Sequence, residues 1–432
     1  MKALFHTLGC KVNQYETEAM KAQLTAAGFE TGEYTPGDRV DDNAVIINSC
    51  TVTGESDRKL RQLLRRCRRD NPACVLVLTG CMPQAFPETA EKLYEADIVL
   101  GNAARAVLAE RIRQFCTLGQ RVIDIPPHGE TIEPLSIREF EGHTRAFVKI
   151  EDGCNRFCTY CIIPYARGRV RSKAPQELKE ELKTLVDSGY TEVVLVGINL
   201  TAYGQDLGLS LCDAVETACA VSGIRRVRLG SLEPDCLTPQ VIARLSQQKK
   251  LCPQFHLSLQ SGCDATLRRM NRHYTTAEYA AVCDALRAAF PHCALTTDVM
   301  VGFAGETEEE FAQSLDFVEQ IGFAKVHVFA YSRRPGTPAA KAPNQVSAAT
   351  KSARSRRLIA AAAEKSRQYH ASWVGETVSV LAETLHEDGT TFGYTPEYVP
   401  VTIRAAVTPG ETVMVTLTDA DENGCVGVVK NS

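Results

Sequence analysis

Short apolar runs alternate regularly with longer helix-like stretches through the middle of this 432-residue chain. Six such runs between residues 146 and 331 have the length of buried strands, and amphipathic stretches such as Thr276–Ala289 separate them. Strands that alternate with helices form parallel sheets. Because a complete barrel of this kind has eight units, six units predict a partial β/α barrel. The predicted strands are Ala146–Ile150, Glu192–Val196, Arg226–Leu229, Phe255–Leu259, Leu295–Val301 and Lys325–Tyr331.

The residues before this region show the same alternation. A helix should follow the first strand there, with Asn13 and Glu16 as its capping box and Gly28 as its stop signal. This pattern predicts a second parallel α/β domain. Its strands are expected at Ala3–Thr7, Ala44–Asn48, Val75–Thr79 and Ile98–Leu100.

The last sixty or so residues differ, because short β-type runs alternate there with turns. Residues 126–140 and 332–344 are rich in Pro and read as boundaries. We therefore predict an α/β protein with an N-terminal parallel α/β domain (1–125), a central partial (β/α)6 barrel (140–370) and a small C-terminal antiparallel β-barrel (371–432).

Seventeen cysteines stand out in a chain of otherwise ordinary globular composition. The cysteine count is odd and the sequence shows no export signal, so a disulfide framework is not expected. No run of about 18 apolar residues occurs, which excludes a spanning helix. These features predict a cytoplasmic protein whose clustered cysteines ligate metal, while most other cysteines are plain buried residues.

The strongest motif is the C-x3-C-x2-C triplet of Cys154, Cys158 and Cys161. Three thiolates on one loop suit an iron–sulfur cluster and leave one iron open for a small molecule. The alternative is a zinc site, but structural zinc usually takes four protein ligands, and no fourth Cys or His lies nearby in the sequence.

A triplet of this spacing after the first strand of a partial barrel resembles the radical-SAM superfamily. The resemblance implies that the open iron binds S-adenosylmethionine (SAM), which is cleaved reductively to a 5′-deoxyadenosyl radical. SAM contacts are then expected where the later strands end. Those positions carry Gly197, Asn199, Ser231, Glu233, Gln260 and Asp298; an Asn or Gln there is equally well explained as a loop cap.

A second trio, Cys10, Cys50 and Cys81, becomes visible only when the predicted strands are drawn. Each cysteine follows the carboxyl end of a predicted N-terminal strand, and those ends lie side by side in a parallel sheet. Three thiolates there can hold a second cluster. The alternative is that these are three of many buried cysteines.

Two cysteine trios followed by a small β-barrel resemble the methylthiotransferase branch of the radical-SAM enzymes. This implies two 4Fe–4S clusters, with the N-terminal one supplying or carrying the transferred sulfur. The segment Thr7–Thr17 is most similar to the subgroup acting on threonylcarbamoyladenosine at position 37 of tRNA. Sister groups act on isopentenyl-adenosine in tRNA or on an aspartate of a ribosomal protein. An electron donor such as flavodoxin or ferredoxin and a sulfur donor are the further partners implied.

Contact with tRNA must come from local patches, because the net charge is −4. The C-terminal segment resembles an RNA-binding TRAM domain, yet residues 376–432 hold nine Asp/Glu against two Lys/Arg. We therefore expect RNA at two basic helices, 58–69 and 347–371, although a solvated helix face explains either charge run. Tyr394, Tyr398 and Phe392 can stack bases or fill the barrel core. The candidate cations of the second helix are Lys351, Arg354, Arg356, Arg357, Lys365 and Arg367.

Two readings compete with this enzyme. A protein-modifying sister enzyme would not depend on tRNA. An iron–sulfur electron carrier or a scaffold without catalysis would not cleave SAM and would leave the partial barrel without a role.

Overall fold

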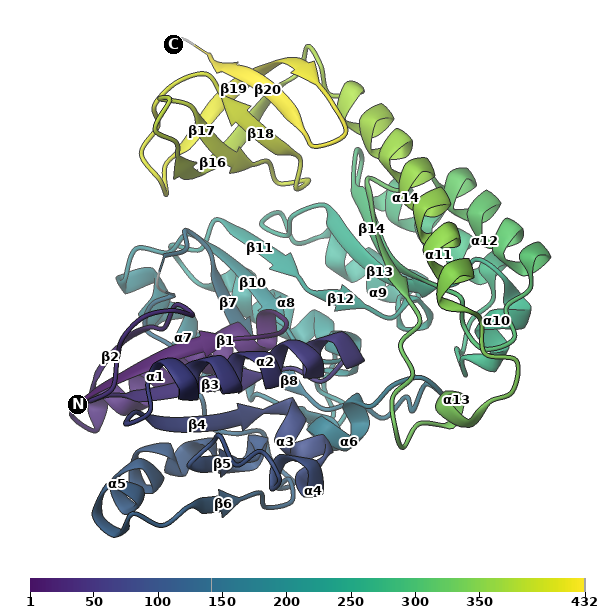
Figure 1. The fold of residues 1–432 in the computed structure, drawn as a ribbon. Helices are drawn as coiled ribbons and strands as arrows, with labels where there is room; N and C mark the ends of the chain where they lie inside the picture. The colour runs from purple at the N-terminus through teal and green to yellow at the C-terminus, as the bar shows by residue number, and fades with distance from the viewer. Residues whose placement is uncertain (141, 431–432) are drawn as a thin grey trace.

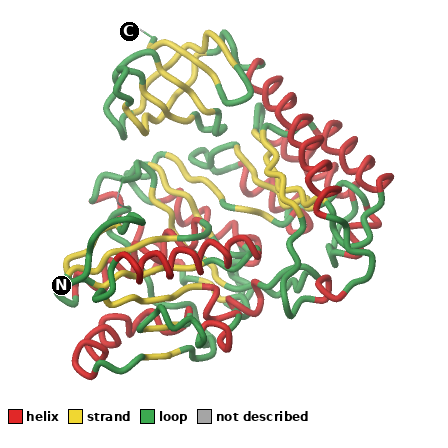
Figure 2. Tube along the Cα trace, viewed as in Figure 1, coloured by secondary structure: helices red, strands yellow, loops and turns green. Residues whose placement is uncertain are grey.

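The computed structural model describes residues 1–140 and 142–430. Figure 1 shows an N-terminal sheet, a central curved array of strands and a small C-terminal barrel, and Figure 2 shows helices on the outer flank of the central array. Among the described residues, no helix combines the length and the apolarity that crossing a membrane requires.

The N-terminal sheet has six strands in the order β2-β1-β3-β4-β5-β6, and every pairing is parallel. Alternate residues of its central strands enter two cores, because α2 covers one face while α1 and α5 cover the other. The four predicted strands are present. The two edge strands, β2 and β6, were missed because they are short and partly polar. The elements are β1 (Lys2–Thr7), α1 (Lys11–Ala26), β2 (Glu30–Glu33), β3 (Ala44–Ser49), α2 (Gly54–Asp70), β4 (Val75–Gly80), α3 (Cys81–Ala85), α4 (Pro87–Ala90), β5 (Ile98–Leu100), the 3-10 turn Asn102–Val107, α5 (Leu108–Leu118) and β6 (Val122–Asp124).

The predicted capping box of the first helix is wrong. Cys10 is the N-cap residue of α1, and Asn13 is the third residue of the helix, where its Oδ1 accepts the Cys10 N–H at 3.4 Å. The helix starts early because Gly9 turns the chain at φ 135°. Glu16 is fully buried and serves a different purpose, described below.

The central region forms two adjoining parallel sheets, β11-β10-β7 and β12-β13-β14-β15. Gly230 separates β11 from β12, so the third β/α unit contributes a strand to each sheet. The six predicted units are all present and surround a large apolar core. The elements are β7 (Ala146–Lys149), β8 (Glu151–Asp152), α6 (Ile163–Arg167), β9 (Arg171–Ser172), α7 (Pro175–Asp187), β10 (Glu192–Val196), the 3-10 turn Leu200–Ala202, α8 (Leu211–Ala220), β11 (Arg226–Leu229), β12 (Ser231–Leu232), the 3-10 turn Pro234–Cys236, α9 (Pro239–Ser246), β13 (Gln254–Gln260), α10 (Asp264–Arg269), α11 (Thr276–Ala289), β14 (Ala294–Val301), α12 (Glu308–Ile321), β15 (Lys325–Ala330), α13 (Pro338–Lys341) and α14 (Ala348–Ala371).

The C-terminal strands close into a five-stranded barrel in the order β16-β17-β18-β20-β19. The expectation of an antiparallel barrel holds for every pairing except β18 with β20, which is parallel. β17 was not predicted, because it is only four residues long and contains a glycine. The strands are β16 (Thr377–Leu385), β17 (Thr391–Tyr394), β18 (Pro400–Ile403), β19 (Thr412–Ala420) and β20 (Cys425–Val429).

Side chains from each part hold the three parts together. Val12, Tyr15 and Ala19 of α1 lie in the apolar core of the central barrel. Arg228 of β11 donates to the carbonyl oxygens of Thr395 (2.6 Å) and Pro396 (2.7 Å) in the C-terminal barrel. The C-terminal barrel is thus fixed over one end of the central array (Figure 1).

Candidate active site

Cys10, Cys50 and Cys81 lie at the carboxyl edge of the N-terminal sheet. Cys10 lies three residues after the end of β1, whereas Cys50 and Cys81 directly follow β3 and β4. These three strands are adjacent in the sheet. The order of the first five strands is that of flavodoxin-like sheets, in which ligands bind where the strand order reverses, between β1 and β3. A Cβ on Gly9 would lie 3.1 Å from the Cβ of Cys50. Glycine at position 9 therefore lets the backbone before Cys10 lie close to Cys50.

Cys154, Cys158 and Cys161 lie on the loop between β8 and α6. Two of the three sulfurs face nitrogen donors: Arg272 donates to Cys158 Sγ at 3.3 Å, and the Asn199 amide lies 3.8 Å from Cys154 Sγ. Burial raises the pKa of Cys154 to about 11 and that of Cys161 to about 12. Without a metal, Cys154 and Cys161 are therefore thiols at neutral pH, and metal binding would release their protons.

The N-terminal sheet and the barrel are joined by the helices that follow Cys81 and Cys161. α6 begins two residues after Cys161 and packs against α3, which begins at Cys81. From the end of α6, the Nε of Arg167 donates to Cys81 Sγ at 3.2 Å. The helices that follow the two cysteine loops, α3 and α6, therefore pack against each other.

A buried charge network surrounds Arg167. Glu16 of α1 accepts from Arg167 (3.0 Å to Nη2) and from Lys149 (2.8 Å), and it pairs with Arg105 at 3.1 Å. Those cations hold the pKa of the Glu16 carboxyl at about 2 in spite of burial. Asp152, which binds Lys149 at 2.6 Å, extends the network to the strand before Cys154.

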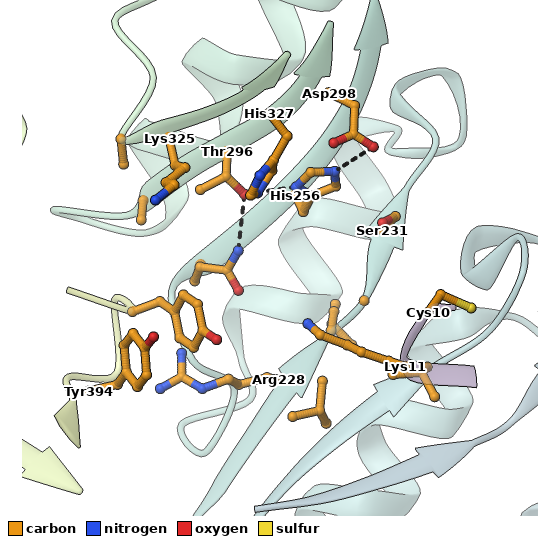
Figure 3. A pocket seen from close by; sticks show the side chains of 18 of the residues that line it. Cys10, Lys11, Arg228, Ser231, His256, Thr296, Asp298, Lys325, His327 and Tyr394 are labelled. Atoms are coloured by element: carbon orange, nitrogen blue, oxygen red, sulfur yellow. Dashed lines mark hydrogen bonds and ion pairs between the residues drawn. The ribbon is translucent and has the colours of Figure 1, made fainter. Parts of the chain in front are cut away.

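One cavity of about 640 Å³ lies between all three parts of the chain. Gly9–Val12 and Gln14 line it from the N-terminal domain, and Tyr394 and Tyr398 line it from the C-terminal barrel. Of the predicted SAM contacts, Gly197, Ser231 and Asp298 also line it. In Figure 3, Cys10 and Lys11 lie on one side of this cavity, opposite Asp298 and His256.

The other three predicted SAM contacts do not line this cavity. Asn199 lies beside Cys154, and Glu233 pairs with Arg272, the residue that donates to Cys158. Gln260 ends β13 in a left-handed conformation, at φ 67°. Gly197 has a steric reason to be glycine, since a Cβ there would lie 2.6 Å from Oε2 of Glu151.

Several cavity residues escaped the sequence analysis. Barrel strands carry polar pairs two residues apart that share the inner face of the sheet. Such period-two polar pairs in otherwise buried strands were the signal that could have found them. The pairs are Gln254 and His256, Thr296 and Asp298, and Lys325 and His327, and of these six residues only Asp298 was predicted from the sequence.

Tyr394 and Tyr398 do not fill the core of the C-terminal barrel. Their rings stack at 4.2 Å between centroids. The guanidinium groups of Arg145 (5.1 Å) and Arg228 (4.9 Å) lie over the ring of Tyr398. The two tyrosines and the two arginines form one side of the cavity. Phe392 packs against Tyr394 but does not line the cavity.

Most cations of the two basic helices are paired. On α14, Arg354 is buried and bound to Glu306 at 2.7 Å, so it is not available to RNA. Arg357 and Arg367 pair with Glu308 and Glu364. Among the described residues, Lys59 of α2 and Arg356 of α14 are exposed and have no ion-pair partner.

The donor sets fit the cofactors that the sequence implies. Each trio consists of thiols alone, the ligands that iron–sulfur clusters use. N–H donors also point at Cys81, Cys154 and Cys158, and hydrogen bonds to the sulfurs are one means by which proteins tune such clusters.

Comparison with known proteins agrees with this geometry. Residues 148–318 match the radical SAM superfamily, and residues 2–101 match "Uncharacterized protein family UPF0004". The radical SAM methyltransferase TsrM from Kitasatospora setae has a similar fold, with a TM-score of 0.56 at 13% identity over 79% of this chain and 77% of that one. Fold and cysteine loop together define a radical-SAM enzyme.

Proteins similar in sequence identify a narrower family among the radical-SAM enzymes. The chain is 38% identical over 410 residues to "Threonylcarbamoyladenosine tRNA methylthiotransferase MtaB" of Bacillus subtilis, covering 93% of this chain and 90% of the relative. It is 36% identical to "tRNA-2-methylthio-N(6)-dimethylallyladenosine synthase" of Pelotomaculum thermopropionicum, covering 89% and 87%. The chain belongs to the radical-SAM methylthiotransferase family, whose members transfer methylthio groups with SAM and 4Fe–4S chemistry.

Proposed function

We propose that this enzyme methylthiolates C2 of N6-threonylcarbamoyladenosine at position 37 in the anticodon loop of tRNA, using two 4Fe–4S clusters. The observation that carries this proposal is the shared cavity. Its lining joins Cys10 of one trio to three of the barrel residues expected to bind SAM, Gly197, Ser231 and Asp298. Cys154, Cys158 and Cys161 are not among the lining residues, but Asn199, three residues after the end of the strand that precedes Gly197, lies beside Cys154. The 38% identity to the Bacillus subtilis relative named for threonylcarbamoyladenosine, against 36% to the Pelotomaculum thermopropionicum relative named for dimethylallyladenosine, favours the first nucleoside.

Cys154, Cys158 and Cys161 would hold the SAM cluster in the region 140–370, and Cys10, Cys50 and Cys81 would hold the auxiliary cluster in residues 1–125. When bound, these groups supply a radical able to activate a C–H bond and a sulfur atom for the new C–S bond. Gly197, Asn199, Ser231, Glu233, Gln260 and Asp298 are the proposed SAM contacts.

The chain's own residues would align these groups and the substrate. Arg167 ties the auxiliary trio to the helix that follows the SAM loop, and Arg272 holds both Cys158 and Glu233. Tyr398 and Tyr394, backed by Arg145 and Arg228, present a face on which a base can stack. The C-terminal barrel, residues 371–432, thereby closes the cavity over the substrate.

The proposal includes a cytoplasmic enzyme that takes electrons from a donor such as flavodoxin or ferredoxin and sulfur from a further donor. Both reactants follow from the chemistry, since SAM cleavage consumes an electron and each turnover consumes a sulfur atom.

The test is nucleoside mass analysis of tRNA from cells that lack this enzyme, before and after complementation. Loss and recovery of 2-methylthio-N6-threonylcarbamoyladenosine is the expected result. Loss of the methylthio-isopentenyl nucleoside, or of the modified ribosomal-protein aspartate with tRNA unchanged, would replace the proposed substrate by that of a sister group.

A further inference from the structure

The Lys11 ammonium is an unpaired cation in the proposed active site. Lys11 is the first residue of α1, next to Cys10, and its side chain extends into the cavity in Figure 3. Its Nζ lies over the ring of Phe147, 5.6 Å from the ring centroid. Within residues 1–140 and 142–430, no carboxylate forms an ion pair with it.

The two arginines that line the cavity already have carboxylate partners. Arg228 binds Glu192 at 2.6 Å, and Arg145 binds Glu383 at 2.6 Å. Both also hold the C-terminal barrel or its tyrosines. Lys11 is thus left as a lining cation beside Cys10 with no carboxylate partner in the part of the chain that the structure describes, and such an ammonium favours an anion as its partner.

Lys11 and Lys325 line the cavity without an ion-pair partner within the described ranges, whereas Arg145 and Arg228 are balanced by Glu383 and Glu192. Of the two carboxylates in the lining, Asp298 lies 3.4 Å from His256, and Glu397 is the other. The cavity therefore favours a substrate that carries negative charge into it, rather than a purely apolar one.

We propose that Lys11 binds the carboxylate of the threonyl group on the substrate adenosine and thereby selects this nucleoside over one with an apolar N6 substituent. This inference rests on the proposed function and names the residue that recognises its substrate. C2 and N6 lie on the same edge of adenine. A carboxylate held beside Cys10 therefore turns that edge toward the auxiliary trio, where the methylthio group is to be added.

The other lysine of the lining, Lys325, is less well placed to hold the substrate beside Cys10. Lys325 is likewise exposed, lines the same cavity and has no ion-pair partner among the described residues, but it lies on β15, apart from the cysteine loops. Figure 3 shows it across the cavity from Lys11, near Thr296. Lys325 is therefore a matched control, because its removal subtracts the same charge from the same cavity.

The test compares binding of three tRNAs to the anaerobically reconstituted full-length enzyme. The tRNAs carry threonylcarbamoyladenosine, isopentenyl-adenosine or unmodified adenosine at position 37. Lys11→Met should weaken binding of the first about 10-fold or more, the usual scale for losing a hydrogen bond between charged groups. Binding of the other two should change less than about 2-fold. Lys11→Arg should restore most of the loss.

Two results would overturn the inference. An equal loss on all three tRNAs would make Lys11 a phosphate contact, and an equal effect of Lys325→Met on discrimination would make the cavity's general charge responsible. Iron content equal to that of the wild type shows that each variant is folded. Failure of the proposed function is seen separately, as absence of methylthiolated product from threonylcarbamoyl tRNA with the unmodified enzyme.

Discussion

Arg167 and Cys81 connect the two halves of the active site, because the Nε of Arg167 donates to the Sγ of Cys81 at 3.2 Å. Arg167 ends the helix that follows the SAM-cluster loop, whereas Cys81 belongs to the proposed auxiliary trio. A side chain of the barrel thus contacts a proposed metal ligand of the neighbouring domain.

The first prediction concerns this bond. Arg167→Lys keeps the charge that Glu16 requires but removes the Nε donor. The auxiliary cluster should then have a more negative reduction potential, and methylthiolation should fall about 10-fold or more, as for other residues that support metal ligands. Potentiometric titration followed by electron paramagnetic resonance measures the shift. Arg171→Lys is the control, since Arg171 lies near Asp152 at 3.5 Å without a cysteine contact; an equal shift there would assign the effect to charge alone.

The second prediction is that the two clusters form independently. Replacing Cys154, Cys158 and Cys161 with Ala should leave about half of the iron and sulfide, held by the N-terminal trio. Replacing the N-terminal trio should leave the other half and preserve SAM cleavage to 5′-deoxyadenosine. Cys116→Ala should change neither quantity, because Cys116 is an exposed residue of α5. Complete loss of iron from the first variant would remove the auxiliary cluster from the proposal.

The third prediction concerns stability. Glu16→Gln removes the negative charge that Arg105, Lys149 and Arg167 share, and breaking a buried ion pair typically costs about 3–5 kcal/mol. Glu30→Gln, at an exposed pair with Lys2, should cost less than about 1 kcal/mol. Thermal melting of the two variants under identical conditions compares them, and equal melting temperatures would contradict a structural role for the network.

The pH dependence of the same network has a definite sign. Because the folded pKa of Glu16 is about 2, below the ordinary value of about 4.3, its stabilisation is complete above that ordinary value. It is lost as the pH falls toward 2. Acid unfolding of the wild type should therefore be steeper than that of Glu16→Gln. A parallel pair of acid-denaturation curves would show that the carboxyl does not titrate between these limits.

The fourth prediction separates the basic residues by their pairing. Lys59→Ala and Arg356→Ala should each reduce the slope of log affinity for tRNA against log salt by about 1 if they contact phosphates. Arg354→Ala should instead destabilise the fold, since it leaves buried Glu306 without its partner. Salt titrations of tRNA binding, with melting curves alongside, measure both effects. Unchanged slopes would move the RNA contact away from α2 and α14.

The buried strands and both cysteine trios could be located from the sequence, because continuous apolar runs and the glycines before Cys10 and Cys81 are local signals; the short strands β2, β6 and β17 carry no such signal. The cavity was not predictable in the same way. Its walls come from three domains, and residues such as Lys11 and Tyr398 meet only after those domains pack together. Ion pairing was equally hidden, since the acids that neutralise Arg354 and Arg357 come from residues 306 and 308.

The six-unit barrel has an open flank, and α1 covers part of it. Val12, Tyr15 and Ala19 enter the barrel's own apolar core, while the Tyr15 hydroxyl donates to Glu181 at 2.8 Å. The N-terminal domain therefore substitutes for scaffold that a complete barrel would build from its missing units. A fragment that begins at residue 140 should expose this seam to water and aggregate, so folding of the central barrel depends on the helix that begins beside Cys10.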